Sequence, residues 1–192
     1  MDTVVKSGCM AKDADMILSE FILLGIGGKE LSEENAAQTA KALNIIQPDF
    51  IRVHATGIKL ESKLGEFVRD GSFTLQSEEE IVIEQKLFLQ QLHEMDSYYV
   101  NEHIVNLLLE VRGNLRTEKQ EMLSTIDRFL TLPPDERLLF TVGRRLNIFF
   151  RLDDLKKPKL HQKAGESLQQ ILSKNPHVDF AALCNYVRQS QI

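Results

Sequence analysis

The chain has 192 residues, of which 43% are hydrophobic and 27% are charged, and its formal net charge is -5. A chain of this length can bury a core as one domain, or as one domain with a small appendage. Its longest apolar run, residues 16–26, contains Ser19 and Glu20 and is shorter than the roughly 20 apolar residues of a membrane-spanning helix. No basic segment leads into an apolar one after Met1, so we expect a cytoplasmic protein with no membrane partner.

The two cysteines lie near opposite ends of the sequence, at Cys9 and Cys184. Two cysteines without CxxC spacing exclude a disulfide-stapled scaffold. We expect Cys184, within "DFAALCNYV", to be buried in a helix, and Cys9 to lie in a loose N-terminal segment.

Three short apolar or aromatic segments predict strands, at residues 17–24, 50–54 and 98–101. Helical patterns separate them, so the segments read as βαβ units with a parallel sheet. No strand pattern follows residue 101. The expected fold class is therefore α/β, with about three parallel strands in residues 1–110 and an all-helical extension in residues 111–192.

The starts of the helices are marked by capping residues. Ser32 is the expected N-cap of the first helix after a strand, because Glu33 and Glu34 follow it. Ser77 with Glu80 has the spacing of a capping box, and so does Thr117 with Gln120. Further helices are predicted from Pro134 or Asp135, over residues 160–173 and over residues 179–189.

One junction is a candidate ligand site. In "FILLGIGGKELSEENAAQTAKAL", residues 21–43, a strand pattern meets three glycines and then a helix. Glycines let the backbone approach a ligand, and a helix N-terminus supplies unpaired N–H donors. A tight turn with no ligand has the same pattern, so both readings stand.

Longer stretches resemble the radical S-adenosylmethionine superfamily. "FILLGIGGKELSEENAAQTAKALNIIQPDFIRV" is similar to its fifth strand, glycine motif, helix and sixth strand, where the usual motif is close to G-L-P-G-E-T. "EHIVNLLLEVRGNLRTEKQEMLSTIDRFLTLPPDERLLFTVGRR" resembles the helical C-terminal extension of one branch of that superfamily. The similarity covers most of the chain from about Met16 onward.

The resemblance implies a fold and a chemistry. Complete members form a partial barrel of six βα units and cleave S-adenosylmethionine to a 5′-deoxyadenosyl radical at a [4Fe-4S] cluster, which three cysteines hold with the usual spacing CxxxCxxC. This chain has no such motif. It therefore resembles a C-terminal part, as a truncated gene, a fragment or a degenerate relative, and we expect it to hold neither cofactor and to be inactive alone.

The resemblance also assigns candidate residues. Gly25, Gly27, Gly28 and Glu30 match the motif that lies beside bound S-adenosylmethionine, although the family often has proline where Gly27 stands. Arg52 ends a strand where residues near the adenine or the substrate lie. The alternative is that the glycines only make a tight turn and that Glu30 is solvated.

Two residues near the last expected strand, His103 and Asn106, also match the family. A histidine that supports a loop is the simpler reading of His103. The five histidines share no ligand spacing, so no metal site is expected.

The partners remain open at this point. Residues 137–163 hold eight Lys and Arg against two Asp, so an RNA contact through residues 144–163 is a third candidate function. A solvated helix face paired with acidic neighbours is favoured, and nucleic acid is not expected. Self-association or a missing N-terminal half could complete the sheet, whose first strand would otherwise have a bare edge. The other candidate function is a non-catalytic module that binds a protein or a nucleotide.

Overall fold

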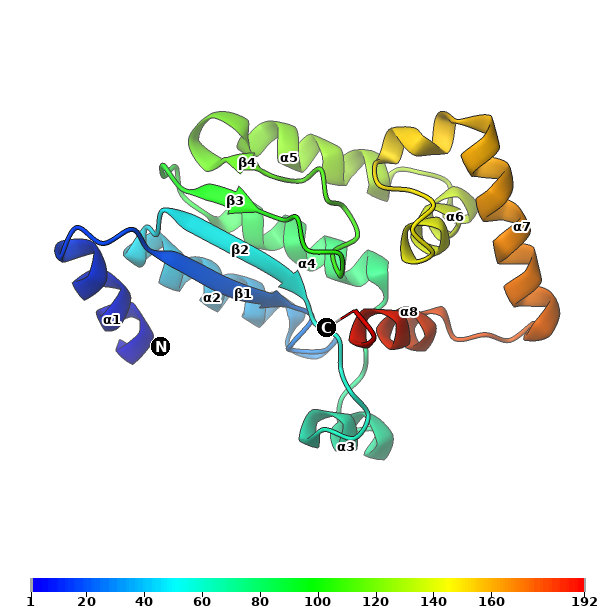
Figure 1. The fold of residues 1–192 in the computed structure, drawn as a ribbon. Coiled ribbons are helices and arrows are strands. Elements are labelled where there is room, and N and C mark those ends of the chain that lie inside the picture. Colours follow the sequence, from blue (N-terminus) through cyan, green and yellow to red (C-terminus); the bar gives the residue numbers. More distant parts are fainter. Residues whose placement is uncertain (1, 192) are drawn as a thin grey trace.

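The computed structural model describes residues 2–191 and contains a four-stranded sheet in the order β1-β2-β3-β4 (Figure 1). The three predicted strands are confirmed as β1 (Ser19–Leu24), β2 (Phe50–Ala55) and β3 (Tyr98–Val100), which pair in parallel. The expectation of no strand after residue 101 is wrong, because β4 (Gly113–Asn114) pairs antiparallel with β3. Two residues are too few to produce an alternating pattern. The fold is α/β, as expected.

Helices connect and follow the strands. In chain order they are α1 (Asp2–Asp13), α2 (Ser32–Ile46), α3 (Lys63–Asp70), α4 (Glu78–Gln91), α5 (Leu115–Leu130), α6 (Pro134–Arg145), the short 3-10 helix η1 (Leu152–Lys156), α7 (Pro158–Lys174) and α8 (Phe180–Gln189). Two of these helices, α1 and α3, were not predicted from the sequence.

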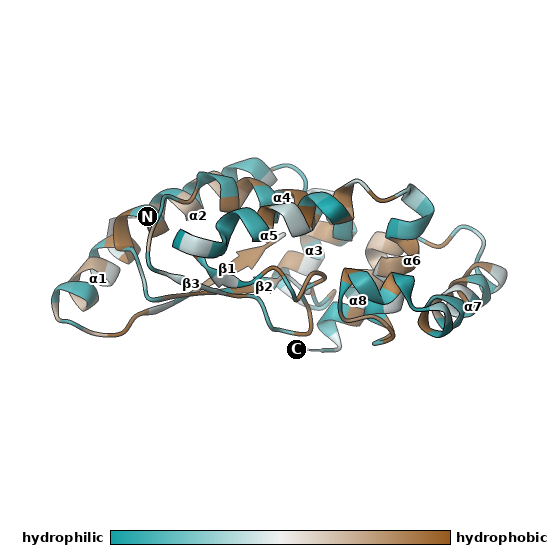
Figure 2. Ribbon diagram, turned by 90° about the horizontal axis from the view of Figure 1, so that it is seen from above, coloured by the Kyte–Doolittle hydropathy of each residue, from teal (hydrophilic) through white to brown (hydrophobic). Residues whose placement is uncertain are grey.

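Helices cover one face of the sheet. Figure 2 shows α2, α4 and α5 above the strands, and alternate strand residues such as Ile22, Ile51 and Tyr99 are buried beneath them. The residues between these point to the other face, where Phe21 is 63% exposed and Leu23 is 46% exposed. The sheet therefore has a covered face and an open face.

The caps of two helices differ from those expected. Ser32 does not cap α2: it is the first helical residue, and its Oγ donates to the Glu84 Oε2 atom of α4 at 2.8 Å. Thr117 does not cap α5, because the Asn114 side chain accepts from Arg116 N and Thr117 N. Short polar side chains at a helix start thus bind whichever partner tertiary packing supplies.

The capping box at Ser77 and the burial of Cys184 are confirmed, whereas the prediction for Cys9 is wrong. Ser77 and Glu80 form the predicted capping box, with Glu80 N donating to Ser77 Oγ at 3.2 Å and Ser77 N donating to Glu80 Oε2 at 2.7 Å. Cys184 is buried in α8 as expected. Cys9 is not in a loose segment, because it lies in α1, which packs against α2.

A buried ion cluster ties the C-terminal helices to the α/β part. The Glu78 carboxylate of α4 accepts from Arg145 of α6, at 3.0 Å to Nε and 2.6 Å to Nη2, and from the Arg188 guanidinium of α8. The three side chains are between 2% and 4% exposed. Burial alone would raise the pKa of Glu78, but the two guanidinium groups outweigh burial and lower it.

The same arginines hold the loops that follow the strands. Arg145 donates to the Val105 carbonyl at 2.9 Å, and Arg188 donates to the Thr56 carbonyl at 3.0 Å. Arg144 donates to the carbonyls of Ile104 and Asn106. The hydrophobic core likewise runs on both sides of residue 110, from Ile22 to Ala164.

The basic stretch is therefore not one solvated face. Arg144 and Arg145 are buried, whereas Arg137 pairs with Glu79 at 3.0 Å, as the paired reading expected. Buried guanidinium groups are not available to phosphates. Separately, no helix within residues 2–191 has the length and apolar character needed to cross a membrane.

We predict that Glu78→Gln destabilises the protein strongly. The change leaves two buried guanidinium groups without their carboxylate, which costs about 3–5 kcal/mol in free energy of unfolding. Urea denaturation measures this loss in the free energy of unfolding. Glu79→Gln is the matched control, because Glu79 sits beside Glu78 in a half-exposed pair whose loss costs about 1 kcal/mol or less. Equal losses in the two variants would contradict the prediction.

We also predict that the protein loses stability in acid because Glu78 becomes protonated. The pKa of Glu78 is lower in the folded chain than in the unfolded chain, so its contribution is complete above the unfolded value of about 4.5 and is lost as pH falls through the folded value. The free energy of unfolding of the parent chain should fall steeply in this range. The Glu78→Gln variant should show a shallower fall, and identical pH profiles would argue against the assignment.

Candidate functional site

The candidate site lies where the parallel strands β1 and β2 end. Carboxyl ends of parallel strands meet at one edge of the sheet, and ligands of open α/β sheets bind there. The glycine turn, residues 25–30, follows β1, and the segment 56–62 follows β2 and leads into α3. The backbone joins the two ends directly, with Thr56 N donating to the Leu24 carbonyl at 2.8 Å.

The glycines of the turn have a structural cause. Gly25 and Gly28 have φ angles of +82° and +62°, which L side chains rarely adopt. A Cβ at Gly28 would lie 2.9 Å from Glu30 Oε2, and a Cβ at Gly27 would lie 2.9 Å from the Leu31 carbonyl oxygen. The turn therefore requires glycine whether or not it meets a ligand.

Several N–H groups of the turn are engaged within the chain. Gly25 N donates to Glu84 Oε1 at 3.0 Å, Gly28 N to the Gly25 carbonyl at 3.3 Å, and Lys29 N to the Thr74 carbonyl at 3.1 Å. The Glu84 side chain is fully buried and also accepts from Asn35 Nδ2 at 2.7 Å. The turn is thus held by α4 and offers fewer free donors than its sequence suggests.

Glu30 is exposed, as the solvated reading expects. A hydrogen bond with the Thr74 side chain is the main cause that lowers the pKa of Glu30, and the Thr74 backbone N, 3.4 Å from Glu30 Oε2, adds to it. The carboxylate thus joins the glycine turn to the segment that precedes α4.

Arg52 lies on the open face of β2. Its Nε donates to Ser19 Oγ of β1 at 3.0 Å, and its Cζ lies 6.0 Å and 5.9 Å from the ring centroids of Phe21 and Phe50. Such distances allow cation–π attraction. The guanidinium therefore lies near two aromatic rings on the open face.

Two histidines meet beside Arg52. The rings of His54 and His103 have centroids 4.3 Å apart, and Phe21 makes an edge contact with His54 at 5.5 Å. Val105 N lies 3.4 Å from His103 Nδ1, so His103 does support its loop. Burial, His103 and Arg52 together lower the pKa of His54 below 6.5, so its imidazole is neutral near pH 7.

These histidines line a small cavity. Its volume is about 270 Å³, and its walls are Leu23, His54, Ala55, Thr56, Gly57, His103 and Val105. The Thr56 Oγ1 atom is buried and has no hydrogen-bond partner among the described residues. The volume is below the range of about 300–1,000 Å³ for whole-ligand pockets, so the cavity fits a flat ring or one end of a ligand.

Asn106 holds the loop that carries His103. Its amide oxygen accepts from Ala55 N at 2.7 Å, and its Nδ2 donates to the Val53 carbonyl at 2.6 Å. The Asn106 amide thereby binds backbone groups at the end of β2 that a neighbouring strand would otherwise bind. The side chain has a structural role at the edge of the cavity.

The predicted residues are only partly brought together. Arg52 shares the open face with both histidines, whereas the cavity walls include none of Gly25, Gly27, Gly28 and Glu30. Sequence reasoning missed the pairing of His54 with His103. The alternation of side chains along a strand places residues 52 and 54 on one face and was the available signal.

The cysteines do not fit a cluster site. Cys9 in α1 and Cys184 in α8 are the chain's two thiols, and a [4Fe-4S] cluster needs several thiolates. Burial raises the pKa of Cys184 to about 12, which disfavours its thiolate form. Within residues 2–191 no group of three His, Cys, Asp or Glu side chains is placed to hold a metal ion.

We predict that His54 titrates below its ordinary pKa of 6.5, and that replacing His103 raises the value. NMR of the histidine ring protons against pH measures both. Arg52→Gln should raise the pKa of His54 as well, whereas Arg69→Gln on the exposed side of α3 should not change it. A His54 pKa that does not respond to either neighbour would contradict the described geometry.

Comparisons of the chain with known family models, curated proteins and solved structures found no match.

Proposed function

We propose that this chain is the C-terminal part of a radical S-adenosylmethionine protein and supplies one side of its cofactor site. One observation carries the proposal: the parallel strands β1 to β3 have helices on one face only, and the opposite face is open (Figure 2). In a closed α/β barrel that inner face is covered by the other strands. A part of such a barrel would expose this face and the edge of β1.

The open-face residues indicate what part of the cofactor they would hold. His54 and His103 line a cavity that fits a flat ring, Arg52 lies beside them on the same open face, and His54 is neutral near pH 7. We assign them the adenine end of S-adenosylmethionine, which stacks on aromatic and guanidinium planes. Complete members use this cofactor to supply a 5′-deoxyadenosyl group. The cysteines present do not fit the cluster, so it would belong to another segment of protein.

Binding of S-adenosylhomocysteine tests the site in this chain. We expect weak, saturable binding that shifts the NMR signals of His54 and His103, and Arg52→Gln should weaken it by about tenfold because the guanidinium that stacks on adenine is lost. Arg69→Gln is the control, since Arg69 lies on exposed α3 away from the cavity. Absence of binding, or equal weakening by both variants, would count against the assigned residues.

Reconstitution tests whether the cluster belongs to another segment of the protein. After anaerobic incubation with iron, sulfide and dithionite, the chain alone should form no 5′-deoxyadenosine. A protein that adds an upstream segment with CxxxCxxC should form it. Product formed by the chain alone with stoichiometric iron would refute the proposal, as would an upstream reading frame without that motif.

The exposed apolar residues of the open face favour a second candidate, an interaction module. Ile17 is 81% exposed, next to Phe21 and Leu23, and β1 is an edge strand. Such edges and patches associate with other chains. Sedimentation should show self-association of the chain alone, reduced by Phe21→Ser but not by the control Phe67→Ser on exposed α3. A monomer at all concentrations would remove this candidate.

A further inference from the structure

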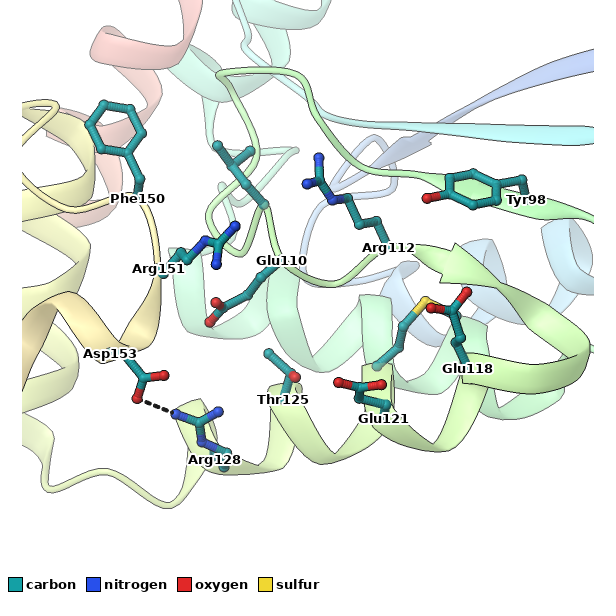
Figure 3. A pocket seen from close by; sticks show the side chains of 12 residues that line it. Tyr98, Glu110, Arg112, Glu118, Glu121, Thr125, Arg128, Phe150, Arg151 and Asp153 are labelled. Carbon is teal, nitrogen blue, oxygen red and sulfur yellow. Dashed lines mark hydrogen bonds and ion pairs between the residues drawn. The ribbon is translucent and has the colours of Figure 1, made fainter.

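A polar cleft lies on the side of the sheet remote from β1. Its volume is about 520 Å³, within the range of small-molecule pockets. One wall is α5, and the other is formed by the segments around residues 110 and 151 (Figure 3). The lining side chains that matter for its chemistry are Tyr98, Glu110, Arg112, Glu118, Glu121, Thr125, Arg128, Phe150, Arg151 and Asp153.

Several of these charges already have partners. Arg128 pairs with Asp153 at 3.0 Å, as Figure 3 shows. Glu110 Oε1 accepts the N–H of Leu152 at 3.0 Å, and Glu118 Oε2 accepts the N–H of Asn114 at 2.6 Å. The Arg128–Asp153 pair joins the two walls, and each of the other two contacts lies within one wall.

Two charges of opposite sign are left over. The side chains of Arg151 and Glu121 make no hydrogen bond or ion pair with any other residue of 2–191, and both are exposed within the cleft. They come from opposite walls, Arg151 from the segment before η1 and Glu121 from α5 (Figure 3). The third arginine, Arg112, pairs with Glu102, which is not a lining residue.

We propose that this cleft binds a small zwitterion of dipeptide size, with its carboxylate on Arg151 and its ammonium on Glu121. A guanidinium binds a carboxylate through two parallel hydrogen bonds, and a carboxylate accepts from an ammonium. Phe150 and Tyr98, which also line the cleft and are each more than 40% exposed, offer aromatic surface for an apolar side chain of the ligand.

Other ligand classes fit less well. The lining holds four carboxylates against three guanidinium groups, so a nucleotide or another multiply charged anion would be repelled. The carboxylates that could attract a metal ion are engaged by backbone N–H groups at Glu110 and Glu118, and no metal-holding group was found within residues 2–191. A ligand with one charge of each sign matches the two free groups.

Titration calorimetry with alanyl-phenylalanine tests the proposal. N-acetylation of the dipeptide removes its ammonium, and amidation removes its carboxylate, and each change should weaken binding to the parent chain by about tenfold. Glu121→Gln should abolish the difference between the dipeptide and its acetylated form only. Arg151→Gln should abolish the difference between the dipeptide and its amide only.

Both variants should fold, because the replaced side chains have no partner within the described chain; circular dichroism and thermal unfolding check this. Glu66→Gln and Arg69→Gln, on exposed α3, are the matched controls and should leave dipeptide binding unchanged. No saturable binding up to about 10 mM, tighter binding of ATP than of the dipeptide, or variants without the crossed pattern would each overturn the proposal.

Discussion

The buried carboxylate of Glu78 is the contact on which the arrangement of the chain depends. It pairs with two of the three guanidinium groups buried near it, those of Arg145 and Arg188. Arg144 has no carboxylate of its own, and burial together with Arg145 lowers its pKa to about 10. Its Nε and Nη1 atoms have no hydrogen-bond partner among the described residues, and the ring of Phe150 lies 5.5 Å from its Cζ. Such a cluster contributes little net stability compared with apolar packing, whereas removal of its carboxylate is strongly unfavourable.

This cluster also determines the shape of the candidate site. The guanidinium groups of Arg145 and Arg188 bind the carbonyls of Val105 and Thr56, two residues that line the cavity. Arg188 and Thr56 are 132 positions apart in the chain. The C-terminal helices thus act on the cavity through backbone contacts, although none of their residues is among its walls. A change in the packing of α8 would therefore alter the cavity without touching a histidine.

Features that depend on neighbouring residues were predictable, and features that depend on distant partners were not. The apolar runs that form β1 to β3, and the capping box at Ser77 and Glu80, are set by local side chains and were predicted. The two-residue strand β4 has no pattern of its own and forms only because β3 lies beside it. The buried Arg145 is paired with Glu78, 67 positions away, so a basic run in the sequence resembled a solvated face.

The glycine turn shows the same limit at the candidate site. Its sequence predicts a tight turn with donors, and the positive φ angles of Gly25 and Gly28 agree with that. The partner of Gly25 N could not be read locally, because Glu84 comes from α4 and is fully buried beneath the turn. Because Glu84 accepts the Gly25 N–H, the turn offers fewer free donors. The polar side chains that remain available lie on the open face of β2. Under the proposed function, Arg52 and the two histidines would therefore recognise the ligand at this edge, through ring and charge contacts more than through backbone donors.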